Sequence, residues 1–300
     1  MKQDKLERET AELADRYCIT DGTKFRLQDV DPGDTAKIKH KKHGEQLLEL
    51  GVELLGKLQE KLYAQDRWGM LLIFQAMDAA GKDGAIKHVM SGVSPQGCDV
   101  FSFKAPSTEE LNHDFLWRTH KCVPERGKIG IFNRSYYEEV LVVKVHHELL
   151  EAEKMPQAAV TKHIWEQRYE DINAHERYLC HNGYVVLKFF LHVSREEQRR
   201  RFLARLETPK KNWKFSLADV KERGYWDDYQ RAYGEMIQRT ATKHAPWYVV
   251  PADNKWFTRL VVAGAVIQAL NGLDMHYPEV DAKRKAELKK VRETLEKEKD

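Results

Sequence analysis

Apolar residues recur at helical spacing between residues 45 and 63, which predicts an amphipathic helix. Leu48, Leu55 and Leu62 stand seven residues apart on one face of this helix. A short apolar run, MLLIF at residues 70–74, follows directly. An uninterrupted run of this kind is typical of a strand that is buried on both faces. The pattern therefore predicts a helix that leads into a central strand.

Short apolar runs then alternate with helical stretches along most of the chain. Further strands are predicted at residues 99–103, 128–132, 184–192 and 247–251. Helices are predicted between them at residues 107–120, 135–146, 160–182 and 194–206. Two of these helices begin with capping-box spacing, Ser107 with Glu110 and Ser194 with Glu197. Alternating strands and helices predict an α/β fold with a parallel five-stranded sheet flanked by helices.

The two ends of the chain depart from this alternation. Residues 1–42 are mostly polar with turn signals, and they predict an irregular N-terminal arm. Residues 43–272 contain every predicted strand and form the main domain, with a basic segment at about 195–225. Residues 273–300 end in dense charge with a thin apolar stripe, which predicts a solvated C-terminal helix. No apolar stretch reaches the about 20 residues that span a bilayer, so we expect a cytoplasmic protein without a membrane partner.

Composition excludes two classes of protein and draws attention to one segment. With 42% hydrophobic and 32% charged residues, the 300-residue chain is neither disordered nor short of a core. Four cysteines in 300 residues are too few for a disulfide scaffold, which is the second class excluded. The cysteines form no CxxC pair and suggest reduced thiols. The formal net charge is only +3, but residues 195–224 hold ten basic and five acidic residues. This segment carries +5, so the rest of the chain sums to −2.

The segment after the first strand is the clearest candidate for chemistry. Residues 76–84, AMDAAGKDG, place small residues and Lys82 at the start of a helix. Backbone N–H groups and the helix dipole attract anions there, and a Lys adds a point charge. The pattern is an imperfect phosphate loop, because Ala76 replaces the first Gly of GxxxxGK[ST] and Asp83 replaces its hydroxyl. Asp78 would repel a phosphate unless a divalent cation lay between them, and its alternative role is to form a turn.

The third strand ends in a second candidate group, IFNRSYYE at residues 131–138. Ligands of open α/β sheets bind at the carboxyl ends of strands, so this group faces the same crevice as the loop. Asn133 stands where a magnesium-binding Asp is common. Arg134 could clamp a phosphate, and its alternative role is a structural ion pair.

The basic segment around residues 195–225 is the third candidate. A mobile basic lid would stabilise the charge of a transferring phosphoryl group. Two other interpretations remain open at this point. The segment interleaves basic and aromatic residues, as nucleic-acid-binding patches do. It could also be a solvated helix face.

Taken together, several long blocks resemble the polyphosphate kinase 2 family, most closely the class that uses both AMP and ADP. The blocks are residues 58–64, 75–104, 113–146, 197–229 and 246–259. The resemblance implies a thymidylate-kinase-like P-loop domain with a helical lid. It also implies reversible transfer of the terminal phosphate of inorganic polyphosphate to AMP or ADP, in the presence of Mg²⁺ or, as an alternative, Mn²⁺.

The resemblance assigns roles to individual residues. The residues expected to be catalytic are Asp78, Lys82, Arg134, Arg201 and Arg205, with Asp78 also the metal ligand. Those expected to bind substrate are Ala79, Ala80, Gly81, Asp83, Gly84, Lys104, Arg118, Lys128, Asn133, Ser135, Tyr137, Glu138, Lys211 and Lys214. Some family members carry Asp at the position of Asn133, so a direct role of Asn133 or Glu138 in metal binding is left open.

Three functions are compared at this stage. The first is a polyphosphate:nucleotide phosphotransferase that acts on adenine and, as an extension, guanine nucleotides, as a dimer or tetramer and without a nucleic-acid partner. The second is an ATP-dependent kinase of a nucleotide or another small molecule. The third is a nucleic-acid-binding P-loop module, for which salt-dependent DNA affinity without phosphotransfer would be the signature.

Overall fold

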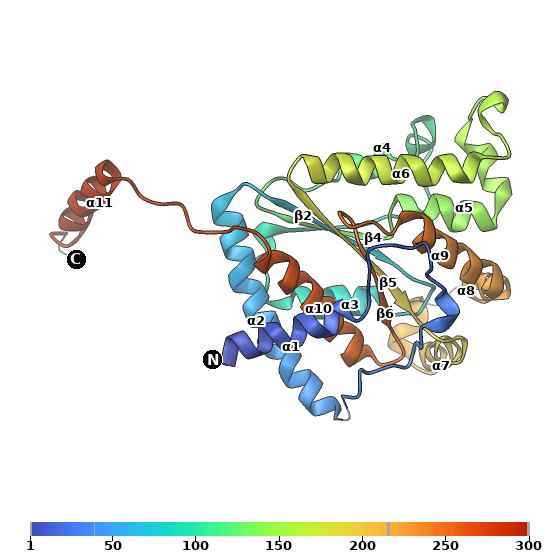
Figure 1. Ribbon diagram of the computed structural model, residues 1–300, viewed down its shortest axis with the longest axis horizontal. Coiled ribbons are helices and arrows are strands. Elements are labelled where there is room, and N and C mark those ends of the chain that lie inside the picture. Colours follow the sequence, from blue (N-terminus) through green and yellow to red (C-terminus); the bar gives the residue numbers. More distant parts are fainter. Residues whose placement is uncertain (1, 39, 215–216, 299–300) are drawn as a thin grey trace.

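A six-stranded sheet runs through the centre of the molecule (Figure 1), in the order β1-β6-β5-β2-β4-β3. The computed structural model describes residues 2–38, 40–214 and 217–298. The strands are β1 (Cys18–Ile19), β2 (Gly69–Gln75), β3 (Cys98–Ser102), β4 (Ile129–Asn133), β5 (Tyr184–His192) and β6 (Trp247–Pro251). Strands β2 to β6 pair in parallel, whereas β1 pairs with β6 in antiparallel orientation. The predicted α/β class is confirmed, but the sheet is mixed and has a sixth strand.

Helices cover both faces of this sheet (Figure 1). The helices are α1 (Lys2–Asp15), α2 (Lys41–Gln65), α3 (Lys82–Val89), α4 (Trp117–His120), α5 (Val142–Val145), α6 (Ile164–His181), α7 (Arg195–Leu206), α8 (Leu217–Glu222), α9 (Trp226–Thr240), α10 (Lys255–Asn271) and α11 (Ala282–Leu295). Helices α1, α2, α3 and α10 lie on one face, and α5, α6 and α9 on the other. All seven residues of β2 are buried, as expected for a central strand between two helical layers.

The N-terminal arm is more ordered than predicted. Residues 2–15 form the helix α1, and residues 18–19 add the edge strand β1, so the prediction of an irregular arm over 1–42 is wrong in these parts. Helix α1 packs on α10, where a Cβ added to Gly264 would come within 2.6 Å of the Thr10 carbonyl oxygen. Among the α1 side chains that the structure describes, Thr10, Leu13 and Ala14 are buried. Two adjacent apolar residues and a Thr leave a weak hydrophobic pattern in the sequence.

Two predicted helices are largely replaced by turns. Within residues 107–120, the capping box forms, since Ser107 N donates to Glu110 at 2.7 Å, yet only a 3₁₀ turn and the four-residue α4 follow. Within residues 135–146, a 3₁₀ helix at Tyr136–Val140 precedes the short α5. Local capping signals start a turn, but they do not decide whether tertiary packing extends it.

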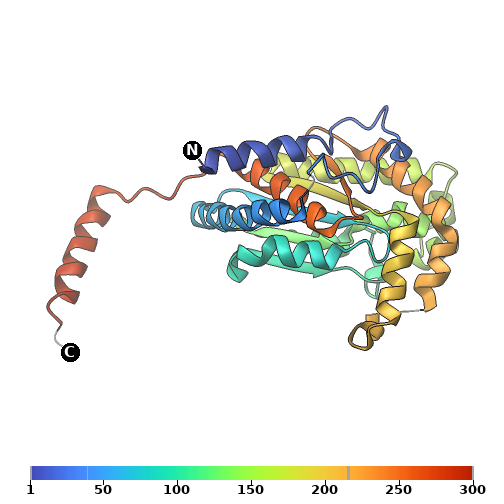
Figure 2. The ribbon, with the colours of Figure 1, turned by 90° about the horizontal axis from the view of Figure 1, so that it is seen from below.

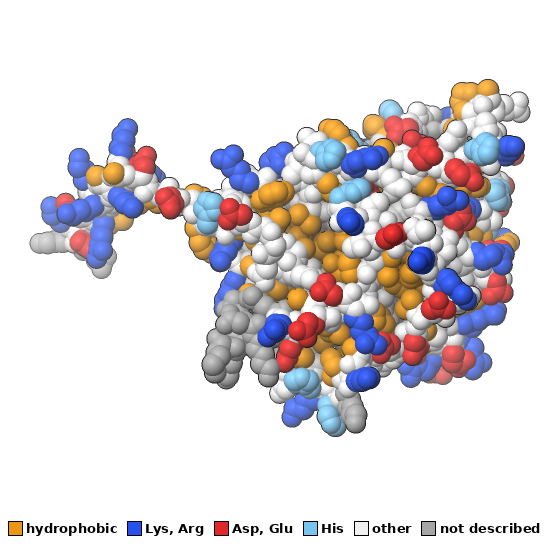
Figure 3. Space-filling model, in the orientation of Figure 1, with side chains coloured by type: hydrophobic (Ala, Val, Ile, Leu, Met, Phe, Trp, Pro, Cys, Tyr) orange, Lys and Arg blue, Asp and Glu red, His pale blue; other side chains and the backbone are white. Residues whose placement is uncertain are grey.

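The C-terminal helix α11 projects away from the rest of the chain (Figures 1 and 2). Every side chain that is described between residues 282 and 298 is exposed, including Leu288, Val291 and Leu295. Lys and Arg side chains gather on this helix (Figure 3). Helix α11 is thus solvated along its length, as its charge pattern predicts. Among the described helices, none combines the length and the apolar character needed to cross a membrane.

Candidate active site

The loop between β2 and α3 forms the floor of the site. Ala79 and Gly81 adopt left-handed backbone conformations, with φ angles of 60° and 110°. These conformations turn the chain sharply from the end of β2 into α3, of which Lys82 is the first residue. The N–H groups of the first turn of α3 therefore face the carboxyl edge of the sheet. Such a helix start attracts anions through its unpaired N–H groups and its dipole.

Lys82 is enclosed by this loop. Its Nζ donates a hydrogen bond to the carbonyl oxygen of Ala76 at 2.8 Å. Burial and, to a smaller extent, the nearby Arg134 guanidinium lower the pKa of Lys82 to about 8, although Asp78 and Glu138 act in the opposite direction. Because a bound phosphate would add negative charge beside the ammonium, it would favour the charged form of Lys82.

Arg134 lies at the end of β4 and faces the loop. Its guanidinium contacts Asp78 at 3.1 Å and Glu138 at 3.5 Å. Glu138 raises the pKa of Arg134, so its charge is permanent. Burial raises the pKa of Glu138 even though Arg134 and Lys82 oppose this shift. The predicted strand-end group and the predicted loop are thus brought into direct contact.

The backbone of Arg134 is unusual for a residue with a side chain. Its φ angle is 66°, in the left-handed region, and its N–H donates to the Phe74 carbonyl oxygen at 3.0 Å. A left-handed residue other than Gly costs about 1–2 kcal/mol, and such strain is concentrated at functional sites. Next to it, Asn133 Nδ2 donates to Asp83 Oδ1 at 2.9 Å.

Arg201 of helix α7 holds the loop in place through hydrogen bonds to backbone oxygens. Arg201, which the sequence predicts to be catalytic, donates to the carbonyl oxygens of Ala79, Ala80, Ala252 and Asp253 at 2.6–3.1 Å. Its Nε donates to Glu197 at 2.7 Å, and the residue is 7% exposed. Because its N–H groups face backbone oxygens, Arg201 joins the loop to the β6–α10 connection. Gln198 reinforces this link by donating to the Asp78 carbonyl oxygen at 3.0 Å.

A cleft of about 850 Å³ opens above the loop. Its walls include the predicted residues Asp78, Ala79, Ala80, Gly81, Lys82, Asp83, Gly84, Lys104, Asn133, Arg134, Arg201 and Arg205. They also include three residues of α10 that sequence reasoning missed, Lys255, Thr258 and Arg259. Lys255 and Arg259 are four positions apart, on one face of α10. Both fall in the family-like block at 246–259, but isolated basic residues at a helix start gave no separate signal.

The oxygen donors at this cleft fit a magnesium ion that is shared with phosphates. Among the described residues, no group of three or more His, Cys, Asp or Glu side chains could hold a metal ion by itself. Mg²⁺ commonly binds to one or two carboxylates and takes its other ligands from water and substrate phosphates. Asp78, with Asp83 and the side-chain oxygen of Asn133 nearby, offers such a partial donor set at the mouth of an anion-binding loop.

A model of the polyphosphate kinase 2 family matches residues 37–278. The chain belongs to this family. It is 54% identical, over 85% of its length and 89% of the other protein, to an ADP-polyphosphate phosphotransferase of Rhodopseudomonas palustris. It is 42% identical, over 88% and 95%, to an AMP/ADP-polyphosphate phosphotransferase of Meiothermus ruber. The crystal structure of polyphosphate kinase 2 from Arthrobacter aurescens superimposes with a TM-score of 0.84, at 41% identity, covering 92% of this chain and 95% of that one.

Some residues predicted for this polyphosphate kinase 2 site lie elsewhere. Lys128 directly precedes β4, so it lies at the amino ends of the parallel strands, on the side opposite the cleft. There its Nζ pairs with Glu125 at 2.9 Å. Arg118 is buried and donates to the Lys104 carbonyl oxygen at 2.7 Å, so it supports the cleft wall from behind. The assignment of substrate contacts to these two residues is therefore corrected.

Two further predicted residues are turned into the core. Ser135 is completely buried, and its Oγ caps the 3₁₀ helix by accepting from Tyr137 N at 3.2 Å. Tyr137 is also completely buried and points to Glu176. Neither side chain lines the cleft. The side chains of Lys211 and Lys214, and residues 215–216 of the predicted lid, lie outside the described part of the structure.

Proposed function

We propose that this chain transfers the terminal phosphate of inorganic polyphosphate to AMP and ADP, and catalyses the reverse reaction. The observation that carries the proposal is the cleft in which Lys82, Arg134 and the α10 cations Lys255 and Arg259 surround the anion-binding start of α3. The names of the Rhodopseudomonas and Meiothermus relatives support polyphosphate as the donor and ADP or both nucleotides as acceptors.

The finer description of the fold is part of this proposal. The anion-binding loop follows β2, which lies between β5 and β4 in the sheet. A loop after a central parallel strand, followed by a helix that starts with Lys, is the arrangement of a P-loop kinase. We assign the chain to the thymidylate-kinase-like form of this fold, with α7 and the following basic residues as the lid.

The proposed reaction requires no covalent intermediate. Phosphoryl transfer depends mainly on the alignment of donor and acceptor and on the neutralisation of charge. Lys82 would contact the phosphates at the loop, and Arg134 would hold the transferring group. Arg205, Lys104, Lys255 and Arg259 would bind the remaining anionic oxygens along the cleft walls. Arg201 would act indirectly, because it keeps the loop in its strained conformation.

Asp78 is the proposed ligand of Mg²⁺, or alternatively of Mn²⁺, and Asn133 and Asp83, which line the same cleft, would assist. When bound, the cation would offset the repulsion between this carboxylate and the substrate phosphates. The Arg134–Asp78 contact would then be exchanged for contacts of each group with ligand. A metal ligand at this position would explain why an anion-binding loop contains a carboxylate, which by itself would repel phosphate.

We propose that adenine nucleotides are the main acceptors, that guanine nucleotides are also used, and that nucleic acid is not a partner. We further propose a cytoplasmic homo-oligomer, either a dimer or a tetramer. The candidate interface residues are the large exposed side chains on two sides of α2, Leu50 at 52% and Tyr63 at 49%.

The decisive experiment combines the purified chain with Mg²⁺, ADP and long-chain polyphosphate and measures ATP. ATP well above that of a reaction without protein is expected. The same yield with and without the protein would refute the proposal. Parallel reactions with AMP, GDP and GMP test the acceptor range, and omission of the divalent cation tests its requirement.

The site assignment is tested by replacing Arg134 with Lys. The change keeps the positive charge but removes the planar fork that can bind two phosphate oxygens. We expect kcat to fall by about 10²-fold or more. Lys128→Met serves as the control, and its kcat should stay within about twofold of wild type because Lys128 lies at the opposite sheet edge. Equal losses in the two variants would contradict the site.

A further inference from the structure

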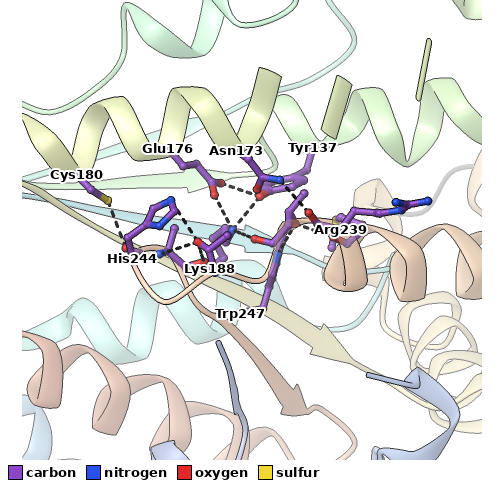
Figure 4. A network of polar contacts seen from close by, with 12 residues as sticks. Tyr137, Asn173, Glu176, Cys180, Lys188, Arg239, His244 and Trp247 are labelled. Carbon is purple, nitrogen blue, oxygen red and sulfur yellow. Dashed lines mark hydrogen bonds and ion pairs between the residues drawn. The ribbon is translucent and has the colours of Figure 1, made fainter. Parts of the chain in front are cut away.

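A completely buried ion pair lies between α6 and β5, away from the cleft (Figure 4). Lys188 Nζ and Glu176 Oε2 are 2.6 Å apart, and both side chains are 0% exposed. Removing two charges from water costs several kcal/mol each, and a well-packed apolar pair of similar size is often at least as stable. Stability alone is therefore a weak reason for this pair.

The pair holds the two tyrosines that follow the strand-end group. Tyr136 and Tyr137 donate from their hydroxyls to the same oxygen, Glu176 Oε1, at 2.9 and 2.7 Å. Lys188 donates to the Tyr137 hydroxyl at 3.0 Å and to the Thr240 carbonyl oxygen at 2.7 Å. Burial raises the pKa of both tyrosines well above the usual value, so both hydroxyls stay protonated donors.

The tyrosines lie within a few residues of the two groups that face the loop. Arg134 stands two residues before Tyr136, and Glu138 directly follows Tyr137. On the other side, the strained Arg134 backbone is held by its hydrogen bond to Phe74. A left-handed conformation of this kind persists only where the surroundings fix it from more than one direction. Beyond Arg134 in the chain, the hydroxyls of Tyr136 and Tyr137 tie the same segment to Glu176.

We propose that Glu176 and Lys188 are positioning residues for the reaction, which act by fixing Tyr136 and Tyr137 and through them the backbone that carries Arg134 and Glu138. The pair does not touch the cleft. The contact of Lys188 with Oε2 orients the Glu176 carboxylate, so that Oε1 accepts hydrogen bonds from both tyrosine hydroxyls. A purely apolar core could fill the same volume, but it would not fix the direction of these side chains.

The test removes the hydroxyls without changing the packing. In Tyr137→Phe, Glu176 still accepts from Tyr136, and Lys188 still donates to Glu176 and Thr240, so no buried partner is left alone. Tyr136→Phe/Tyr137→Phe removes both anchors. We expect kcat to fall about threefold in the single variant and at least about tenfold in the double variant, with KM for ADP within about twofold. The expected loss is in kcat because Arg134 would be misaligned in the transition state.

Tyr17→Phe is the matched control. Tyr17 is also buried and also donates its hydroxyl to a carboxylate, Asp34, at 2.8 Å, but it lies next to the edge strand β1. Its Tm should fall about as much as that of Tyr137→Phe, while its kcat should stay at the wild-type value. If Tyr137→Phe and the double variant also keep wild-type kcat, the network only stabilises the core and the proposal is wrong.

A second measurement needs no turnover. Amide hydrogen exchange at residues 134–138 should accelerate at least about tenfold in the double variant relative to strands β2 and β5. Unchanged exchange there would overturn the proposal even if activity fell. The kcat test rests on the proposed polyphosphate activity. If the wild-type protein lacks that activity, the proposed function is refuted, and hydrogen exchange alone decides on the positioning role. If the double variant does not fold, Tyr137→Phe decides the question by the same two readouts.

Discussion

At the scale of single residues, Lys82 links the charge of the cleft to pH. Burial lowers its pKa to about 8, well below the usual value for Lys, because the enclosed ammonium loses hydration. Lys82 is therefore charged below about pH 8 and neutral above it in the ligand-free protein. Phosphate binding needs the charged form.

This shift predicts an alkaline limit of activity. For ADP and polyphosphate, kcat/KM should fall as pH rises through about 8, since it reports the ligand-free protein. The corresponding fall in kcat should occur at higher pH, because bound phosphates stabilise the ammonium. Initial rates between pH 6.5 and 9.5 measure both limits. A flat kcat/KM across this range would show that Lys82 does not have to be charged.

The site residues illustrate what sequence can and cannot specify. Lys82 and Arg134 were predictable, because each follows a recognisable strand and chain direction then places both at one sheet edge. The same rule would have excluded Lys128, which precedes its strand. Tyr137 was not predictable as a core residue, because its orientation depends on Glu176 from a helix far along the chain. Arg259 was missed because a Lys and an Arg four positions apart at the start of an otherwise apolar helix are too common a pattern to indicate a site.

At the scale of elements, α7 contains two arginines with different roles. Arg201 donates to backbone oxygens of two loops, whereas Arg205 lines the cleft and lies against the Phe202 ring at 5.5 Å. The first arrangement holds the structure of the site together. The second leaves a cation beside the path of an anionic ligand.

Replacing each arginine with Met should separate these roles. Arg201→Met should lower the free energy of unfolding by on the order of 3 kcal/mol, because several buried carbonyl oxygens lose a charged donor. Arg205→Met should lower Tm less than Arg201→Met does, but raise KM for polyphosphate several-fold. Thermal melting and initial rates distinguish the outcomes. A stable Arg201→Met protein would mean that the loop does not depend on this clamp.

The contact between α1 and α10 gives a prediction about stability. Gly264→Ala would place a Cβ 2.6 Å from the Thr10 carbonyl oxygen, so α1 would have to shift. We expect a loss of about 1–3 kcal/mol in the free energy of unfolding. Gly224→Ala is the control, since within the described part of the chain no atom beyond its own neighbours lies within 4 Å of the added Cβ. Chemical denaturation should show a clear loss for the first variant and little change for the second.

The bounds of the helices and strands were most predictable where an element is deeply buried. Strands β5 and β6 begin and end at the predicted residues, because a continuous apolar run leaves little choice of structure. Helix α1 and strand β1 were not predictable, since the buried residues among the described side chains of α1 are few and β1 pairs with β6 through two residues. Where tertiary contacts rather than local pattern define an element, the sequence contains a weaker signal.

At the scale of the whole molecule, α11 stands apart from the domain that the family model matches. That match ends at residue 278, and α11 begins at Ala282. Its exposed stripe of Leu288, Val291 and Leu295 contacts no buried core residue. The domain therefore has little structural dependence on the C-terminal segment.

Removing residues 279–300 tests this independence. Tm should change by no more than about 1 °C, because the described side chains of α11 contribute no buried area. Differential scanning calorimetry of the two forms provides the measurement, with size-exclusion chromatography at the same concentration. A marked fall in Tm together with a smaller assembly would show that α11 packs against another copy in solution.

The ion pairs inside the cleft also affect how its affinity responds to salt. Arg134 already faces Asp78 and Glu138, so in the ligand-free state it has little need of a counterion from solution. A phosphate that takes this arginine displaces a protein carboxylate rather than a dissolved anion. Binding at this point is an exchange of partners, and it releases few small ions. The salt sensitivity of substrate binding should therefore arise mainly from the outer walls of the cleft, while the ligand-free floor keeps its shape in dilute and concentrated buffer alike.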